Sequence, residues 1–140
     1  MVARRLVLAA AALALAAPSR AGAEYPDWEE LAAVPVIEVL TRDPDGALRE
    51  TSVWFVLVEG VPHLRTSGSR WLENLRRDPQ LGLRIEGREY EARAEAVPGD
   101  AIVEQVDRAT REKYGWQERA IHLFRLRTPD ILRLSPRDGG

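Results

Sequence analysis

The sequence predicts a mainly β protein: a small antiparallel barrel with two inserted helices. Short apolar segments follow one another at hairpin spacing, and residues that favour turns separate them. Only two stretches show helical spacing instead. Closing a sheet into a barrel removes exposed edges that would otherwise pair with other chains. With 140 residues, 45% of them hydrophobic, the chain is long enough for one domain with a real core.

The first 23 residues predict a cleavable export signal. Arg4 and Arg5 precede an unbroken apolar run over residues 6–17, and Ala21-Gly22-Ala23 supplies small residues for a signal peptidase. This run spans roughly 18 Å, short of the ~30 Å hydrocarbon core, so we expect no permanent membrane anchor. A buried N-terminal helix is the less favoured alternative, because the run has no polar face and Pro18 ends it. The arginine pair leaves a twin-arginine route open beside general secretion.

Composition excludes several classes of function. The formal net charge is −2, and the export signal carries three arginines but no acid, so the mature chain is more acidic still. Nucleic acid is therefore not an expected partner. The chain has no cysteine and only His63 and His122, which excludes disulfides, thiol nucleophiles and cysteine or multi-histidine metal sites. We expect no metal. No serine-hydrolase, P-loop, Rossmann or HExxH pattern is present.

The mature chain begins with an extension and then strands. We divide the chain into a signal peptide (1–23), an N-terminal extension (24–33), a barrel domain (34–135) and a C-terminal tail (136–140). Residues 34–40 predict a strand that stops at the Asp43–Gly46 turn. Thr51–Val58 is β-branched and aromatic on both parities, which predicts one central strand covered on both faces. His63–Thr66 follows as a short third strand, with His63 itself exposed at its start.

The first helix and a hairpin follow. Ser69 is a suitable N-cap, the apolar side chains of Trp71, Leu72 and Leu75 form one stripe, and Asp78-Pro79 stops the helix. Asn74 in this helix is interpreted as an amide that closes the adjacent turn or contacts a ligand. Alternation then predicts a hairpin with strands over residues 81–85 and 90–96.

The remaining chain predicts a second helix and two strands. From Asp100 the apolar spacing becomes helical for about thirteen residues, and Gly115 lies where a C-terminal cap belongs. Lys113 and Tyr114 stand at that helix end, where the helix dipole favours a cation. Residues 121–126 and 131–134 predict the last two strands, and His122 lies in the first of them.

The segment between the third strand and the first helix is suited to binding an anion. Arg65, Ser67, Ser69 and Arg70 offer guanidinium and hydroxyl donors, and the helix start adds backbone N–H groups. The alternative is a capped loop whose arginines are simply solvated. Local chemistry alone leaves both interpretations open.

Several short motifs together resemble a known superfamily. They are Val53-Trp54-Phe55-Val56, His63-Leu64-Arg65-Thr66-Ser67, Ser69-Arg70-Trp71-Leu72-Glu73-Asn74-Leu75, Asp78-Pro79 and Arg111-Glu112-Lys113-Tyr114-Gly115. The pattern resembles the flavin- and deazaflavin-binding split β-barrels of the pyridoxamine-phosphate-oxidase-like superfamily. Within these it is similar to the deazaflavin-dependent nitroreductase type and closest to an uncharacterised bacterial family. The resemblance covers residues 34–134.

This resemblance implies a homodimer with FMN or a deazaflavin at the subunit boundary. The residues it assigns to the phosphate side are Arg65, Thr66, Ser67, Ser69, Arg70 and Trp71. Val53 and Trp54 would line the ring, although a Trp at position 54 is more often part of a core than of a cofactor wall. Lys113 would face the ligand or only end its helix. Because a flavin supplies its own reactivity, no protein nucleophile is expected.

Two functional hypotheses follow. The first is an exported oxidoreductase that passes a hydride from a flavin-like cofactor to quinone-like or nitro-aromatic acceptors. The second is a non-catalytic envelope binding module that has lost the cofactor and uses the same groove for another anionic or aromatic small molecule. Export favours the second, since flavin and deazaflavin pools are mainly cytoplasmic.

Overall fold

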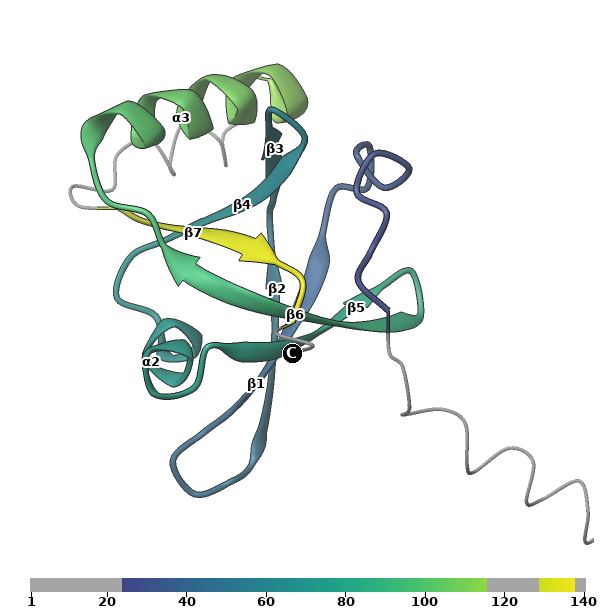
Figure 1. The fold of residues 1–140 in the computed structure, drawn as a ribbon, viewed down its shortest axis with the longest axis vertical. Helices are drawn as coiled ribbons and strands as arrows, with labels where there is room; N and C mark the ends of the chain where they lie inside the picture. Colours follow the sequence, from purple (N-terminus) through teal and green to yellow (C-terminus); the bar gives the residue numbers. More distant parts are fainter. Residues whose placement is uncertain (1–23, 116–128, 138–140) are drawn as a thin grey trace, which may run out of the picture.

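A computed structural model of the protein describes residues 24–115 and 129–137. In that part of the chain seven strands and two helices are present (Figure 1). The strands are β1 (Ile37–Arg42), β2 (Leu48–Val53), β3 (Val56–Val58), β4 (Val61–Thr66), β5 (Gln80–Ile85), β6 (Arg88–Ala96) and β7 (Asp130–Ser135). The helices are α2 (Arg70–Arg77) and α3 (Asp100–Tyr114). The predicted signal peptide, the predicted strand over residues 121–126 and the last three residues of the tail lie outside the described residues.

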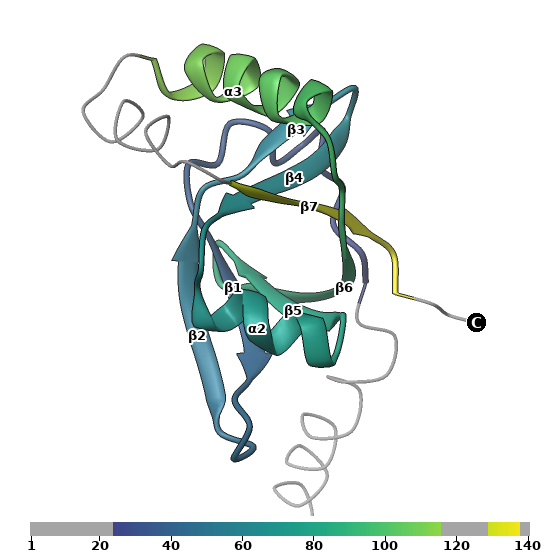
Figure 2. The ribbon, with the colours of Figure 1, turned by 90° about the vertical axis from the view of Figure 1, so that its left-hand side faces the viewer.

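The seven strands form one antiparallel sheet in the order β2-β1-β5-β6-β7-β4-β3. The two strands at its ends, β2 and β3, are consecutive in the chain and only Trp54 and Phe55 separate them. The sheet therefore curls until its ends meet at this junction, as Figure 2 shows. The result is the predicted small split barrel, mainly antiparallel β with two helices.

The predicted central strand over Thr51–Val58 is wrong. The segment forms two strands, β2 and β3, and both lie at ends of the sheet order. The chain leaves the strand conformation at Trp54 and Phe55, where the Tyr114 hydroxyl on α3 bonds to Phe55 N (3.3 Å) and lies 3.1 Å from Phe55 O. A side chain from a distant helix thus takes the place of a strand partner.

Side chains on both faces of this segment are apolar because the barrel has two hydrophobic clusters, one on each face. Val53 and Phe55 pack into the barrel interior, whereas Trp54 and Val56 pack beneath α3. Alternate residues of β1, β5 and β6 point into the barrel interior. Three of them, Val39, Leu83 and Ala92, are 0% exposed. The alternation that predicted the β5–β6 hairpin is thus confirmed.

The N-terminal extension belongs to the barrel. Trp28 is only 4% exposed and packs in the interior cluster, with its ring 5.2 Å from that of Phe55. The Tyr25 hydroxyl donates to Leu134 O (3.2 Å), and Glu91 N donates to Glu24 O (3.1 Å). Residues 24–33 therefore fold back on the barrel.

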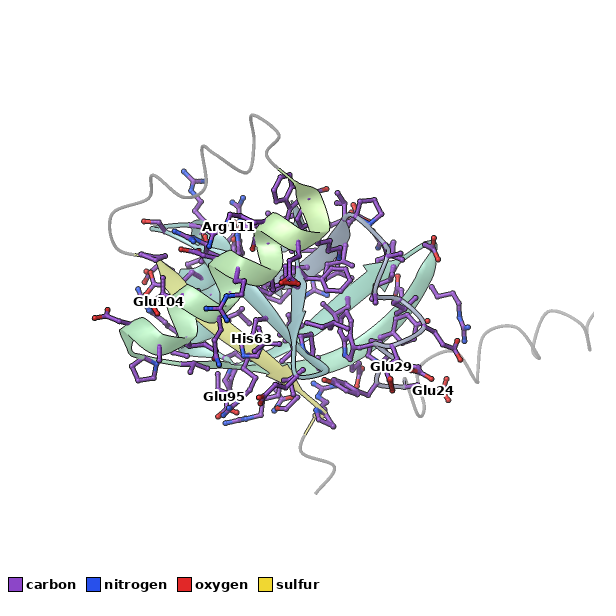
Figure 3. The ribbon with its side chains drawn as sticks, turned by 90° about the horizontal axis from the view of Figure 1, so that it is seen from above. Glu24, Glu29, His63, Glu95, Glu104 and Arg111 are labelled. Carbon is purple, nitrogen blue, oxygen red and sulfur yellow. The ribbon has the colours of Figure 1, made fainter. Side chains whose placement is uncertain are left out.

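His63 is buried and not exposed as predicted, with 4% of its surface accessible. Its Nδ1 lies 2.8 Å from Val61 O, and burial lowers the pKa of the ring. Strand register places Arg133 between His63 and Glu95, both of which are labelled in Figure 3. His63 lies between Val56 of β3 and Arg133 of β7, on the face of β4 from which Arg65 reaches Asp107 of α3, and the strand pattern could not reveal these neighbours.

Candidate functional site

The turn between β4 and α2 is held by hydroxyl groups. Thr66, the last residue of β4, donates from Oγ1 to Ser69 Oγ (2.9 Å). Ser69 Oγ in turn accepts from Leu72 N (3.3 Å), which confirms the predicted N-cap. Gly68 between them has a φ of 62°, a conformation that glycine adopts without strain. Both hydroxyls therefore stabilise the turn itself.

Ser67 and Arg70 are the exposed donors at this turn. Among the described residues neither side chain makes a hydrogen bond or ion pair. The first backbone N–H groups of α2 also lack partners within the helix, because they precede its first turn. Trp71 is 5% exposed and anchors the helix in the barrel interior. A guanidinium, a hydroxyl and helix N–H groups thus stand at one rigid turn.

Arg65 points away from this turn. Its side chain is 6% exposed and forms an ion pair with Asp107 of α3. Adjacent residues of a strand project to opposite faces, so Arg65 faces α3 while Thr66 faces the barrel interior. The predicted phosphate residues consequently divide into two groups, Arg65 beneath α3 and the others at the β4–α2 turn.

The residues predicted to line the ring lie at the junction of β2 and β3. Val53 packs against the interior cluster, and half-buried Trp54 stacks on Tyr114 with ring centroids 3.9 Å apart and planes at 10°. Lys113 Nζ donates to Phe55 O (3.0 Å) and lies 3.4 Å from the centroid of the Phe55 ring. Burial lowers the pKa of Lys113 to about 8.

Tyr114 organises this junction, a role that the sequence reasoning missed. Its hydroxyl lies 2.8 Å from Pro35 O and bonds to the backbone of Phe55, so it ties α3 to the chain before β1 and to the break before β3. Burial raises the pKa of Tyr114 to about 12. The Lys-Tyr-Gly motif indicated a helix end but carried no signal of this contact.

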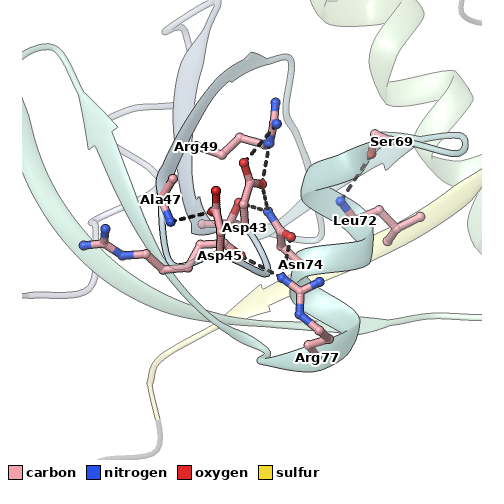
Figure 4. Close-up of polar contacts among 10 residues, drawn as sticks. Asp43, Asp45, Ala47, Arg49, Ser69, Leu72, Asn74 and Arg77 are labelled. Atoms are coloured by element: carbon pink, nitrogen blue, oxygen red, sulfur yellow. Dashed lines mark hydrogen bonds and ion pairs between the residues drawn. The ribbon is translucent and has the colours of Figure 1, made fainter.

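Asn74 connects α2 to the β1–β2 turn (Figure 4). Its Nδ2 donates to Thr41 Oγ1 (3.0 Å) and Asp43 Oδ1 (2.9 Å), and its Oδ1 accepts from Arg77 (2.6 Å). Arg49 also binds Asp43, through two hydrogen bonds of 2.7 and 3.0 Å. The pKa of Asp43 is lowered, first by the Arg49 hydrogen bond and then by that of Asn74. Asn74 therefore has a structural role, but the turn it holds is the distant β1–β2 turn and not the predicted adjacent one.

An open cleft of about 590 Å³ lies beside this cluster, and the sequence reasoning did not anticipate it. Residues of β1, α2, β5 and β6 line it, with Gly82 in its wall. Several of its charged groups are paired with one another, for example Arg84 with Glu89 and Arg137 with Glu91.

Two kinds of feature are absent from the described ranges. No group of three or more metal-ligating side chains comes together among residues 24–115 and 129–137. In the same part of the chain, neither helix combines the length and the apolar character needed to cross a bilayer.

Comparison with known proteins identifies the fold. No protein-family model and no curated protein sequence matches the chain. Among solved structures, it is similar to a conserved hypothetical protein of Mycobacterium tuberculosis (23% identity, TM-score 0.64, 85% of each chain covered). It is also similar to HutZ, the heme storage protein of Vibrio cholerae (23% identity, TM-score 0.64, covering 81% of this chain and 90% of that one). A third similar structure is that of an F420-H2-dependent reductase (14% identity, TM-score 0.54, covering 72% of this chain and 94% of that one). The shared architecture is the split β-barrel.

Proposed function

We propose that the protein binds a flavin-like cofactor, FMN or a deazaflavin. In this proposal the phosphate lies at Ser67 and Arg70 and the ring lies beside Trp54. The observation that carries it is the exposed Arg70 guanidinium, which has no hydrogen bond or ion pair within the described residues, at a turn already made rigid by Thr66 and Ser69. The F420-dependent reductase of the same fold supports the choice of cofactor class.

The donor set fits the two chemically different ends of such a cofactor. A guanidinium fork and helix N–H groups are strong partners for a phosphate. A flavin ring is flat and largely apolar, and half-exposed Trp54 offers an aromatic edge or face for it. Arg65 is assigned no part in phosphate binding here, because its guanidinium is engaged by Asp107.

As an enzyme the protein would be an oxidoreductase that acts on quinone-like or nitro-aromatic acceptors. The bound cofactor would supply the hydride chemistry. The residues of this chain would bind the phosphate, orient the ring and place the positive charge of Lys113 at the β2–β3 junction near it. We also propose that a second copy of the chain completes the ligand site, as in the homodimer that the resemblance implies.

A specific observation favours a second candidate, a non-catalytic binding module. Three of the predicted phosphate residues are engaged within the fold: Arg65 with Asp107, and Thr66 with Ser69. Only Ser67 and Arg70 keep exposed donors, a small set for a phosphate. The similarity to HutZ, a heme storage protein, shows that this fold also occurs in a protein named for storage rather than for catalysis.

The state of the protein in its own cell envelope separates the two candidates. We propose export with cleavage near Ala23; Glu24, which would then begin the mature chain, accepts a hydrogen bond from Glu91 N. Protein isolated from its native periplasm is expected to be yellow and to release a fluorescent flavin or deazaflavin on denaturation. Colourless protein that stays colourless at high yield favours the binding module without a flavin.

Replacing Arg70 tests the phosphate site. A hydrogen bond to a charged group is worth about 1.5–3 kcal/mol, so Arg70→Ala should weaken FMN or deazaflavin binding by roughly tenfold to a hundredfold. The readout is quenching of cofactor fluorescence in a titration of the protein. Arg76→Ala is the matched control, since Arg76 is an exposed arginine in the last turn of the same helix.

The control also defines the contrary result. If Arg70→Ala and Arg76→Ala bind the cofactor with equal affinity, Arg70 contributes no more than another exposed arginine of the helix, and the phosphate assignment would fail. No binding of either cofactor by the unaltered protein would remove the flavin proposal altogether.

A further inference from the structure

The cleft beside Asn74 lies on the outer face of the sheet. Burial alternates along β1 and β5, and the outward residues of these strands that line the cleft include Leu40, Arg42, Gly82 and Arg84. Leu40 is paired with Gly82 in the sheet, and a Cβ atom at position 82 would lie 3.3 Å from the Leu40 side chain. Glycine at this position therefore keeps the middle of the cleft low and leaves Leu40 as its apolar floor.

Two arginines at one end of the cleft keep unused donors. Arg77 Nη2 donates to Arg42 O (2.9 Å) and to Asn74 Oδ1 (2.6 Å), which fixes the guanidinium and leaves its Nε and Nη1 without partners among the described residues. The Arg42 side chain donates only to a backbone carbonyl of the β1–β2 turn (3.3 Å). Of the carboxylates that line this end, Asp43 is bound by an arginine of β2 and Asp78 accepts from a backbone N–H (3.1 Å). This end of the cleft therefore presents guanidinium donors to an anion.

The opposite end of the cleft has an excess of negative charge. Arg84 is surrounded by three carboxylates, at 3.0 Å from Glu38, 2.9 Å from Glu50 and 3.3 Å from Glu89. A single guanidinium balances only one of these three charges. Glu89 lines the cleft, is exposed, and uses only its Oε2 in the contact with Arg84. Its other oxygen is available to a cationic group.

The two charged ends are four residues apart along the sheet. Glu38 and Arg42 both point outward from β1, and at a strand rise of about 3.3 Å per residue their Cα atoms are separated by about 13 Å. An extended peptide has nearly the same rise per residue, so roughly four residues cover this distance. The ends of such a peptide carry an ammonium group and a carboxylate group. Both charges are complementary to the ends of the cleft.

We propose that the cleft binds short extended peptides of about four residues with both termini free. The N-terminal ammonium of the peptide binds Glu89, and its C-terminal carboxylate binds Arg42 and Arg77. The opposite charges at the two ends of the cleft fix the direction of the peptide and exclude chains with blocked termini. This inference does not depend on a bound flavin, because no residue of the turn before α2 lines the cleft.

Tetraalanine is the probe for this site, and calorimetric titration of the full chain measures its affinity. N-acetyl-tetraalanine lacks the ammonium group, and tetraalanine amide lacks the carboxylate group. Dialanine keeps both charges but spans only about 6 Å, so it cannot reach both ends. We expect tetraalanine to bind roughly tenfold or more tightly than each of these three ligands, because each of them gives up a charged contact.

Two substitutions assign the ends of the peptide. Arg42→Gln should weaken the binding of tetraalanine by roughly tenfold and leave the affinity for its amide unchanged, because the amide has no carboxylate to lose. Glu89→Gln should weaken the binding of tetraalanine in the same way but not that of the N-acetyl form. Arg76→Gln is the matched control, since Arg76 is an exposed arginine of α2 that does not line the cleft.

The pairing of variants with blocked peptides separates binding from a structural effect. A variant that merely disturbs the cleft would lose affinity for the free and the blocked peptide alike. Such an equal loss in Arg42→Gln, equal affinity of the unaltered protein for free and blocked peptides, or no binding of tetraalanine at millimolar concentration would overturn the proposal.

Discussion

Trp28→Ala is expected to lower the free energy of unfolding by about 3–5 kcal/mol, the cost of truncating a buried aromatic residue. Trp28 is 4% exposed and lies in contact with two aromatic rings. The Tyr25 ring meets it edge-on at 6.2 Å, and the Phe55 ring lies 5.2 Å away at 57°. Such a loss would be large compared with the total stability of a small domain, roughly 5–15 kcal/mol.

Urea unfolding followed by fluorescence and circular dichroism measures this loss. Val36→Ala is the matched control, because Val36 lies close to the same segment in the sequence but is 40% exposed, so its truncation should cost well under 1 kcal/mol. A loss for Trp28→Ala as small as that of the control would mean that residues 24–33 contribute nothing to the core and are a true extension.

Asn74→Leu is expected to cost about 2–4 kcal/mol, since it leaves buried polar groups without partners. Leucine has a similar volume but can neither donate to Thr41 and Asp43 nor accept from Arg77. Thr41 is 5% exposed, so water cannot readily replace the lost bond. The effect therefore comes from the hydrogen bonds that join α2 to the β1–β2 turn.

Glu73→Leu is the control for this substitution. Glu73 is an exposed neighbour on α2 whose ion pair with Arg76 lies on the surface, and such pairs contribute about 0–1 kcal/mol. The midpoint of thermal unfolding, measured for both variants under the same conditions, should fall by several degrees more for Asn74→Leu. Equal midpoints would show that the Asn74 cluster is not a source of stability.

Features set by a few neighbouring residues could be predicted from the sequence. The Asp43–Gly46 turn, the Ser69 cap, the alternation of β5 and β6, and the end of α3 at Gly115 all depend on local conformational preferences. The curled antiparallel sheet followed from the number and spacing of these elements. α3 has 15 residues, slightly more than the thirteen or so that were predicted.

Features set by distant contacts could not be predicted in this way. The break at Trp54 and Phe55 depends on a hydroxyl from Tyr114, about sixty residues further along the chain (|i−j| = 59). Apolar residues on both parities have two physical explanations, a central strand or two hydrophobic clusters, and the sequence does not distinguish them. The burial of His63 between β3 and β7 has the same kind of origin.

The face of β4 to which Arg65 projects, in contrast, could have been predicted from the sequence. Arg65 and Thr66 are adjacent in a strand, so their side chains cannot face the same ligand. Strand alternation alone therefore predicts the division of the phosphate residues that the structure shows, with Arg65 paired to Asp107 of α3. Resemblance to a motif suggested which residues matter, but not which of them converge.

The proposed phosphate site at the start of α2 is tested most directly by NMR of ¹⁵N-labelled protein during addition of FMN. The proposal predicts that the backbone amide signals of residues 67–71 shift most, together with the indole N–H signal of Trp54. Inorganic phosphate should shift the backbone amide signals of residues 67–71 and leave the indole signal of Trp54 unchanged. Shifts confined to the cleft beside Asn74, or no shifts at saturating FMN, would contradict it.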